Sequence, residues 1–218
     1  MCTQKPPQDY SGDLYERYKE DTDNYVKSTV LPPLKEMHGE LLLRGLVERW
    51  GKYKRIVKFQ MMVFRYLERY YIPKKALPPL QKVSFTSFQD MVFNEIKSTV
   101  TATVIGMIDD EREGKSIDRD LLNNVLDIFV QTGDGNLDIY RDDFEQTFFN
   151  ATTNYYSRKA QTLNKECSDH DYMLKVEECL QEAEERVAHY LRSSTEPQLM
   201  EAVRSALTTR HAELTTEA

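Results

Sequence analysis

Apolar residues recur along the chain at intervals of three and four positions from Ser11 onward, almost without interruption. This spacing places them on one face of an α-helix, and no stretch alternates between apolar and polar residues as a half-buried strand would. The pattern predicts an all-α protein with about eight helices, packed antiparallel in bundles because the links between them are short. The predicted helices cover the ranges 11–31, 40–50, 53–72, 85–113 and 138–162, the positions around 122–129 and 173–190, and a last helix from about Thr195.

Residue types that favour caps and breaks predict where several helices begin and end. Ser11, Ser116 and Asp118 are expected N-caps, because their side-chain oxygens accept hydrogen bonds from free amides of the first turn. The Pro32-Pro33 pair is expected to end or kink the first helix, and Gly51 to end the second. The last complete bundle helix is expected to bury a narrow seam with alternating spacing: Met173, Val176, Leu180, Ala183, Val187 and Tyr190.

Composition narrows the class of protein. The chain has 218 residues, of which 40% are hydrophobic and 30% charged, with only eight glycines and eight prolines, which suits long helices better than a turn-rich β fold. A net charge of −7 argues against nucleic acid or an anionic membrane as the main partner. Three cysteines without a paired motif, and no apolar signal segment, predict an intracellular protein. We expect it in the cytoplasm and nucleus, and we expect no cofactor.

The segment "DDEREGKSIDRDLL", residues 109–122, is dense in carboxylates and has two interpretations. The favoured one is a solvated corner, in which Asp109 to Glu111 close one helix, Gly114 turns the chain, and Asp118 and Asp120 lie in the first turn of the next. Acidic side chains are stabilising at a helix N-terminus, which agrees with the second pair. The alternative is a functional carboxylate cluster, either a metal site or a general acid–base pair.

Other candidate chemistry is weaker. Residues 134–145, "DGNLDIYRDDFE", place oxygen ligands at the positions of a calcium-binding EF-hand loop, but Ile139 stands where the loop needs glycine. Cys167, His170 and Cys179 lack a fourth ligand at a zinc-site spacing. No nucleophile elbow, phosphate loop or dinucleotide motif occurs. We therefore expect neither a metal site nor an enzyme.

The range 52–75 is the strongest basic run and is also rich in methionine and aromatic residues. Its apolar side chains outnumber what one buried stripe can hide, and methionine and tyrosine beside basic residues suit a protein–protein contact. The alternative is a fully buried helix whose lysines extend to solvent. On the first interpretation the partner-binding residues are Met61, Met62, Arg65, Tyr66 and Arg69.

Several long phrases together resemble the N-terminal region of the cullins, specifically the SCF-type cullins and most closely their plant members. The matching phrases are "NYVKSTVLPPL" (24–34), "RYLERYYIPKKALPPL" (65–80), "DDEREGKSIDRDLLNNVLDI" (109–128), "NYYSRKA" (154–160), "DYMLKVEECL" (171–180) and "ERVAHYLRSSTEPQL" (185–199), in collinear order. The resemblance implies stacked helical bundles called cullin repeats, arranged as an elongated stalk. It also implies a partial first repeat in 1–75, a linker in 76–84, a near-complete second repeat in 85–210 and a frayed tail in 211–218.

In this family the stalk tip binds a Skp-type adaptor carrying an F-box protein, and a distant C-terminal domain recruits a RING-box protein. Compared with the family, Met1 matches an internal methionine, the RING-recruiting domain does not follow, and "KFQMMVF" replaces a more aromatic stretch. The resemblance thus implies a scaffold fragment in ubiquitin-dependent protein degradation, without ligase activity or RING-box binding, whose adaptor binding is weak or lost. The alternative is a helical interaction module that sequesters an adaptor or self-associates.

Overall fold

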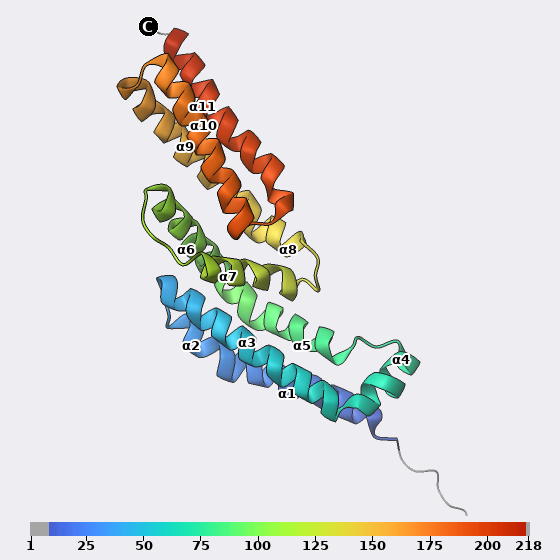
Figure 1. The fold of residues 1–218 in the computed structure, drawn as a ribbon. Coiled ribbons are helices and arrows are strands. Elements are labelled where there is room, and N and C mark those ends of the chain that lie inside the picture. Colours follow the sequence, from blue (N-terminus) through green and yellow to red (C-terminus); the bar gives the residue numbers. More distant parts are fainter. Residues whose placement is uncertain (1–8, 217–218) are drawn as a thin grey trace, which may run out of the picture. The chain divides into compact units, whose positions relative to one another are not determined.

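The computed structural model describes residues 9–216, apart from the side chains of Asp169 and of residues 209–216. Within this part of the chain every regular element is helical, which confirms the all-α prediction (Figure 1). Four π-helical segments and one 3₁₀ turn interrupt or join the α-helices: Val26–Val30, Leu67–Tyr71, Gln89–Phe93, Arg141–Glu145 and Ser193–Thr195. The α-helices are α1 (Ser11–Tyr25), α2 (Leu31–Lys35), α3 (Gly39–Val63), α4 (Ile72–Lys75), α5 (Leu80–Phe88), α6 (Asn94–Arg112), α7 (Arg119–Thr132), α8 (Asp138–Tyr140), α9 (Gln146–Glu166), α10 (Asp169–His189) and α11 (Glu196–Thr216).

The chain forms two compact units. The first contains the residues up to Lys97 together with 131–135, and the second contains 98–130 together with the residues from Asn136. This division differs from the one expected at 76–84. Most of that predicted linker is helical, because α5 begins at Leu80, whose side chain is fully buried, and only 76–79 lie outside a helix. At the other end, α11 continues to Thr216, so the backbone of the predicted frayed tail is helical as far as it is described.

Two predicted helix ends are wrong. The Pro32-Pro33 pair does not end the helix, because the chain stays helical from Ser11 to Lys35; the regular α-helical pattern is instead interrupted just before the prolines by the π-helical segment Val26–Val30. Gly51 lies inside α3, which runs unbroken from Gly39 to Val63. The predicted range 53–72 divides instead at Phe64, which leaves the helical conformation with φ −91° and ψ 24°.

Gly51 offers a direct test of helix continuity. A Cβ added there would meet nothing within 4 Å, so Gly51→Ala introduces no clash. Alanine loses less backbone freedom on folding than glycine, and we expect the variant to raise the free energy of unfolding by about 0.5–1 kcal/mol. Urea unfolding followed by circular dichroism measures this gain. A loss of stability would show that the chain bends or opens at Gly51.

The first unit is built around two groups of aromatic residues. The Trp50 ring lies 4.6 Å from that of Phe88 and 4.9 Å from that of Phe85, which joins α3 to α5. Tyr18 of α1 and Tyr53 of α3 both hydrogen-bond Ser84, through its hydroxyl (2.6 Å) and its carbonyl (2.8 Å). Each buried phenol therefore has a partner, and the three helices share one polar anchor inside an apolar core.

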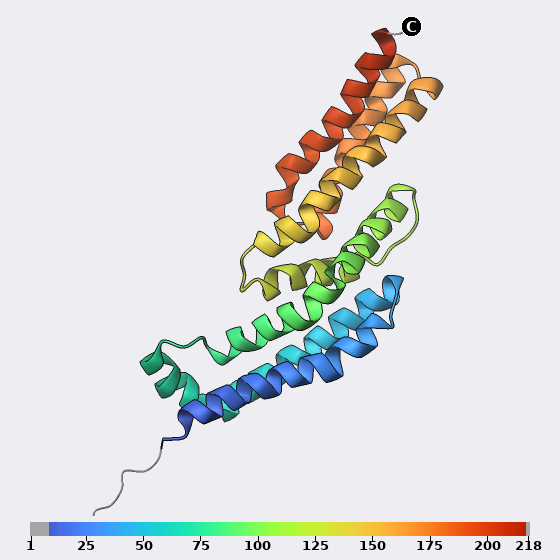
Figure 2. The ribbon, with the colours of Figure 1, turned by 180° about the vertical axis from the view of Figure 1, so that it is seen from behind.

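In the second unit α9, α10 and α11 pack along one another (Figures 1 and 2). The predicted seam of α10 begins one residue too late. Met173 is half exposed and Leu180 only partly buried, and the buried side chains are Tyr172, Val176, Cys179, Ala183, Val187 and Tyr190. The Tyr172 hydroxyl donates to the carbonyl of Leu207 at 2.7 Å, so its polar end is satisfied within the core.

Local contacts test two predicted helix caps and the possible EF-hand loop. Asp118 caps α7, since its carboxylate accepts from the amide of Leu121 at 2.9 Å, as predicted. Ser11 does not act as a cap; it is the first helical residue of α1, and its amide donates to the Asp9 carboxylate at 3.0 Å. Ile139 lies in a helical segment continuous from Asp138 to Glu166, so these residues are not arranged as an EF-hand loop.

Candidate partner-binding surface

The end of α3 and the segment after it expose an unusual amount of apolar surface. Along α3 one stripe faces the core at helical spacing, including Leu46, Trp50, Tyr53 and Val57. After Val57 this stripe is not continued by a fully buried residue until Leu67, because the helix ends at Val63 and restarts in a new phase. Of the apolar side chains between these points, Met61 and Phe64 are partly buried, and Phe59, Met62, Val63 and Tyr66 face solvent.

We define the 59–70 surface as the exposed side chains of this stretch. The apolar members Phe59, Met62, Val63, Tyr66 and Tyr70 are each 58–66% exposed. The rings of Tyr66 and Tyr70 lie 5.4 Å apart, so these two side chains form one continuous apolar area. The exposed Arg65 and Arg69 lie among them in the chain, and the exposed Arg55 and Lys58 come just before them.

Four of the five predicted partner-binding residues are exposed on this surface: Met62, Arg65, Tyr66 and Arg69. Met61 is different, because it is partly buried and packs against the core cluster that contains Tyr15, Tyr18 and Leu67. A partner-binding role requires an exposed side chain, so this prediction is wrong for Met61. The surface also includes Phe59, Val63 and Tyr70, which the site prediction left out. Their spacing of three to four residues from Met62 and Tyr66 is the sequence signal that identifies them.

The 59–70 surface has the composition of a contact patch. Exposed aromatic and methionine side chains lose little free energy when a partner displaces their water, and nearby arginines add charge-assisted hydrogen bonds.

In the described part of the chain, no three histidine, cysteine or acidic side chains gather as a metal site would require. A search of the same residues finds no helix with the length and apolar character needed to span a bilayer.

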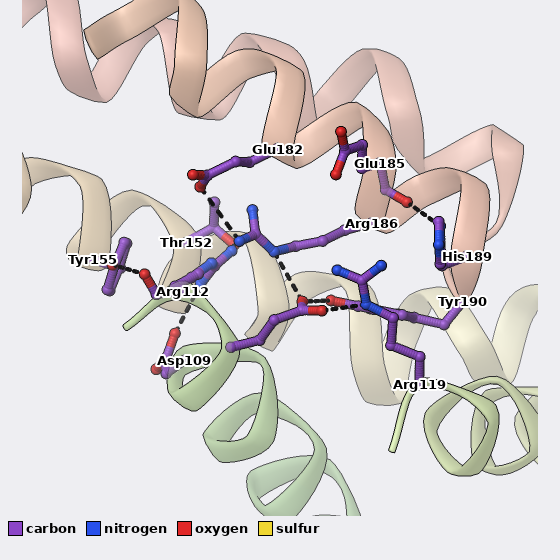
Figure 3. A network of polar contacts seen from close by, with 11 residues as sticks. Asp109, Arg112, Arg119, Thr152, Tyr155, Glu182, Glu185, Arg186, His189 and Tyr190 are labelled. Atoms are coloured by element: carbon purple, nitrogen blue, oxygen red, sulfur yellow. Dashed lines mark hydrogen bonds and ion pairs between the residues drawn. The ribbon is translucent and has the colours of Figure 1, made fainter. Parts of the chain in front are cut away.

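The acidic segment 109–122 is a corner between helices, as predicted, but its central carboxylate is buried. Glu111 has an exposed side-chain fraction of 8%, and both of its oxygens are occupied. One accepts from Arg119 at 2.5 Å, and the other accepts from Arg186 at 3.0 Å and from the Tyr190 hydroxyl at 2.7 Å (Figure 3). Glu111 therefore ties the α6–α7 corner to the end of α10.

The ionisation of Glu111 follows from these contacts. Burial raises the pKa of its carboxyl group, but hydrogen bonds from Tyr190 and Arg119 and the charges of Arg186 and Arg119 outweigh it, so the pKa lies below the ordinary value. Burial and the neighbouring carboxylate raise the pKa of Tyr190, whose hydroxyl therefore remains a donor. Glu111 is thus held as a charged, fully engaged acceptor, which suits a structural role rather than proton transfer.

Arg112 forms a second buried contact at the same corner. Its side chain is 2% exposed, donates to Asp109 at 2.8 Å and to the Thr152 hydroxyl at 2.7 Å, and lies 5.1–5.6 Å from the rings of Phe148, Tyr155 and Tyr156. By contrast, Asp110 forms an exposed pair with Lys115 at 2.7 Å. The acidic cluster thus has a buried member, Glu111, and an exposed member, Asp110.

Comparison with known proteins identifies relatives over nearly the whole chain. A family model of the cullin alpha solenoid domain matches residues 1–218. The chain is 51% identical to Cullin-1 of Oryza sativa subsp. japonica over 212 residues, which are 97% of this chain and 28% of that protein. It is 45% identical to Cullin-2 of Arabidopsis thaliana over 207 residues, which cover 95% and 28% of the two chains. It is also 42% identical to Cullin-like protein 3 of Arabidopsis thaliana over 201 residues, covering 92% of this chain and 77% of that one.

Proposed function

The chain belongs to the cullin family, and we propose that it is a non-catalytic scaffold segment of a ubiquitin ligase complex, which binds a Skp-type adaptor with its F-box protein through the 59–70 surface. The chain spans 28% of the length of the rice Cullin-1 and of the Arabidopsis Cullin-2 that it matches. The ligase activity and the RING-box contact of a whole cullin are therefore not assigned to it. We place its action in the cytoplasm and nucleus, in keeping with its cysteine usage.

The exposed apolar surface between Phe59 and Tyr70 is the observation that carries this proposal. Apolar side chains exposed to this extent and close together in one segment are unfavourable in water and typical of a surface that a partner covers. Aromatic residues, methionine and arginine, the main constituents of this surface, are enriched where proteins bind one another.

The charge of the 59–70 surface favours an acidic partner over a second copy of the chain. The whole protein carries a net charge of −7, yet this segment is basic, with Arg65 and Arg69 exposed among the aromatic residues. A symmetric dimer through the same surface would bring like charges together, which costs free energy. An adaptor with acidic groups around an apolar groove would instead be complementary in both respects.

Size exclusion with light scattering tests the proposal, using the full chain alone and mixed with a purified Skp-type adaptor–F-box complex. We expect a monomer alone and a 1:1 complex in the mixture, of lower affinity than that of a full-length cullin. The double variant Met62→Ala/Tyr66→Ala is expected to weaken the complex at least tenfold, since truncation of central interface residues costs about 2 kcal/mol or more.

Met173→Ala/Leu174→Ala is the matched control, because both residues are exposed apolar side chains, 50% and 48%, on α10 of the second unit. This control should bind the adaptor as the unmodified chain does. Equal loss in both double variants would point to non-specific apolar adhesion. A dimer of the chain alone that is abolished by the Met62→Ala/Tyr66→Ala substitutions would assign the surface to self-association.

A further inference from the structure

The basic range 52–75 contains a single acidic residue, Glu68. It lies in the π-helical segment Leu67–Tyr71, within the 59–70 surface, and is only partly exposed. One oxygen of its carboxylate accepts from the backbone amide of Leu80 at 2.7 Å. The one negative charge of this range is therefore directed to the start of α5.

The start of α5 gains from Glu68 an acceptor that its own N-cap residue cannot supply. The N-cap position is occupied by Pro79, whose side chain has no oxygen. The amides of a first helical turn lack a helical acceptor, and a carboxylate satisfies one of them while matching the positive end of the helix dipole. Because Leu80 is the first residue of the helix and its side chain is fully buried, Glu68 is held at a fixed point of the core.

This contact adds direction to the packing of the π-helical segment. Leu67 and Ile72 are buried in the same apolar cluster as Leu80, which keeps the segment against the core. Apolar contacts are not directional, whereas a hydrogen bond is, so the contact between Glu68 and Leu80 fixes the rotation of the segment about its axis. That rotation decides which neighbouring side chains face solvent.

The same contact leaves two arginines of the 59–70 surface available. Glu68 follows Arg65 by three positions, a spacing at which a helix commonly forms an ion pair, and it directly precedes Arg69. Both arginines are exposed, and neither forms an ion pair within the part of the chain that the structure describes. Their charges can therefore meet acidic groups of a partner.

We propose that Glu68 is a positioning residue of the 59–70 surface. By capping α5 it holds the π-helical segment in the orientation that exposes Arg69 and Tyr70, and it leaves Arg65 and Arg69 unpaired. The functional meaning of this role rests on the proposed adaptor contact, but the positioning itself is measured on the chain alone.

Amide hydrogen exchange of the full chain tests the positioning. In Glu68→Ala we expect exchange at least about tenfold faster at Leu80 and at residues 67–71, because a charge-assisted hydrogen bond that protects them is lost. Glu68→Gln keeps an oxygen acceptor, so exchange at the same amides should change by less than about threefold. Glu95→Ala is the matched control, since it removes an exposed carboxylate of the first unit, paired with Lys35 at 2.7 Å, and should leave these amides unchanged.

Adaptor affinity is the second readout, since a residue that only stabilises the fold would not alter the affinity of variants that remain folded. With the Skp-type adaptor–F-box complex as the probe, Glu68→Ala should bind about threefold to tenfold more weakly than the unmodified chain. Glu68→Gln should bind at least as tightly as the unmodified chain, because the acceptor remains and the surface loses its only carboxylate.

Unchanged exchange in Glu68→Ala overturns the positioning role, and so does faster exchange throughout the first unit, which would make Glu68 a contributor to global stability alone. Equal weakening of the adaptor complex by the alanine and glutamine variants would assign the effect to charge and contradict the proposal. If the unmodified chain does not bind the adaptor, the proposed function fails, while hydrogen exchange still decides the role of Glu68. Should Glu68→Ala fold poorly by circular dichroism, Glu68→Asp replaces it, because its carboxylate is one methylene too short for the 2.7 Å contact and should give the same local increase in exchange.

Discussion

Replacing Glu111 by alanine is expected to lower the free energy of unfolding by about 3–5 kcal/mol, because it leaves buried partners without their acceptor. The Arg186 side chain is 6% exposed and would keep only its 3.5 Å contact with Glu182. The Tyr190 hydroxyl would lose its 2.7 Å hydrogen bond, and Arg119 would lose its 2.5 Å ion pair. Urea unfolding followed by circular dichroism measures the change.

Asp110→Ala is the matched control for this effect. Asp110 is the adjacent carboxylate and also forms an ion pair, with Lys115 at 2.7 Å, but both partners are more than half exposed. Exposed pairs contribute little, so we expect a change within about 0.5 kcal/mol. Similar losses in the two variants would show that the corner as a whole, rather than the buried Glu111 network, stabilises this unit.

The pH dependence of stability provides a second test of Glu111. Because its pKa in the folded chain lies below the ordinary value of 4.5, the carboxylate contributes stability that is present above its unfolded pKa and is lost as the pH falls through the folded pKa. Glu111→Gln lacks this titration. The stability difference between the unmodified chain and Glu111→Gln should therefore be constant near neutral pH and diminish as the pH falls below the ordinary carboxyl value of 4.5.

The Glu111 network illustrates which part of a site sequence can predict. The spacing from Asp109 to Asp120 correctly predicts a helix end, a turn at Gly114 and a new helix. The partners that bury Glu111, Arg186 and Tyr190, lie 75 and 79 positions further along the chain. Nothing in the local pattern signals them, so a carboxylate that the structure buries is predicted to be solvated.

The 59–70 surface shows a second reason why periodicity does not fully predict which side chains are exposed. Periodicity correctly predicts an excess of apolar residues in this range, but it carries one helical phase through the whole of 53–72. Met61 lies before the break at Phe64, four residues after the buried Val57, so it continues the core-facing stripe of α3, whereas Tyr70, in the π-helical segment after the break, remains exposed. At Gly51 the sequence predicts a helix end that the structure does not have. Its helix penalty of about 1 kcal/mol is smaller than what the buried residues on both sides of it contribute, and α3 continues.

Trp50→Ala is expected to destabilise the first unit by about 3–5 kcal/mol, the cost of removing a large buried aromatic side chain. Trp50 is 2% exposed, its ring contacts those of Phe85 and Phe88, and its indole N–H donates to the side chain of Gln131 at 2.9 Å. Burial of the ring, rather than this hydrogen bond, should dominate. The loss is measured by thermal and urea unfolding with circular dichroism.

Two further substitutions separate these contributions. Gln131→Ala removes the acceptor of the indole N–H and should cost about 1–3 kcal/mol, because the buried donor is left without a partner. Trp50→Phe keeps an aromatic ring between Phe85 and Phe88 but needs no acceptor, so it should cost less than Trp50→Ala by at least about 1 kcal/mol. If Gln131→Ala were as destabilising as Trp50→Ala, the hydrogen bond to Gln131, rather than the aromatic core joining α3 and α5, would hold this unit together.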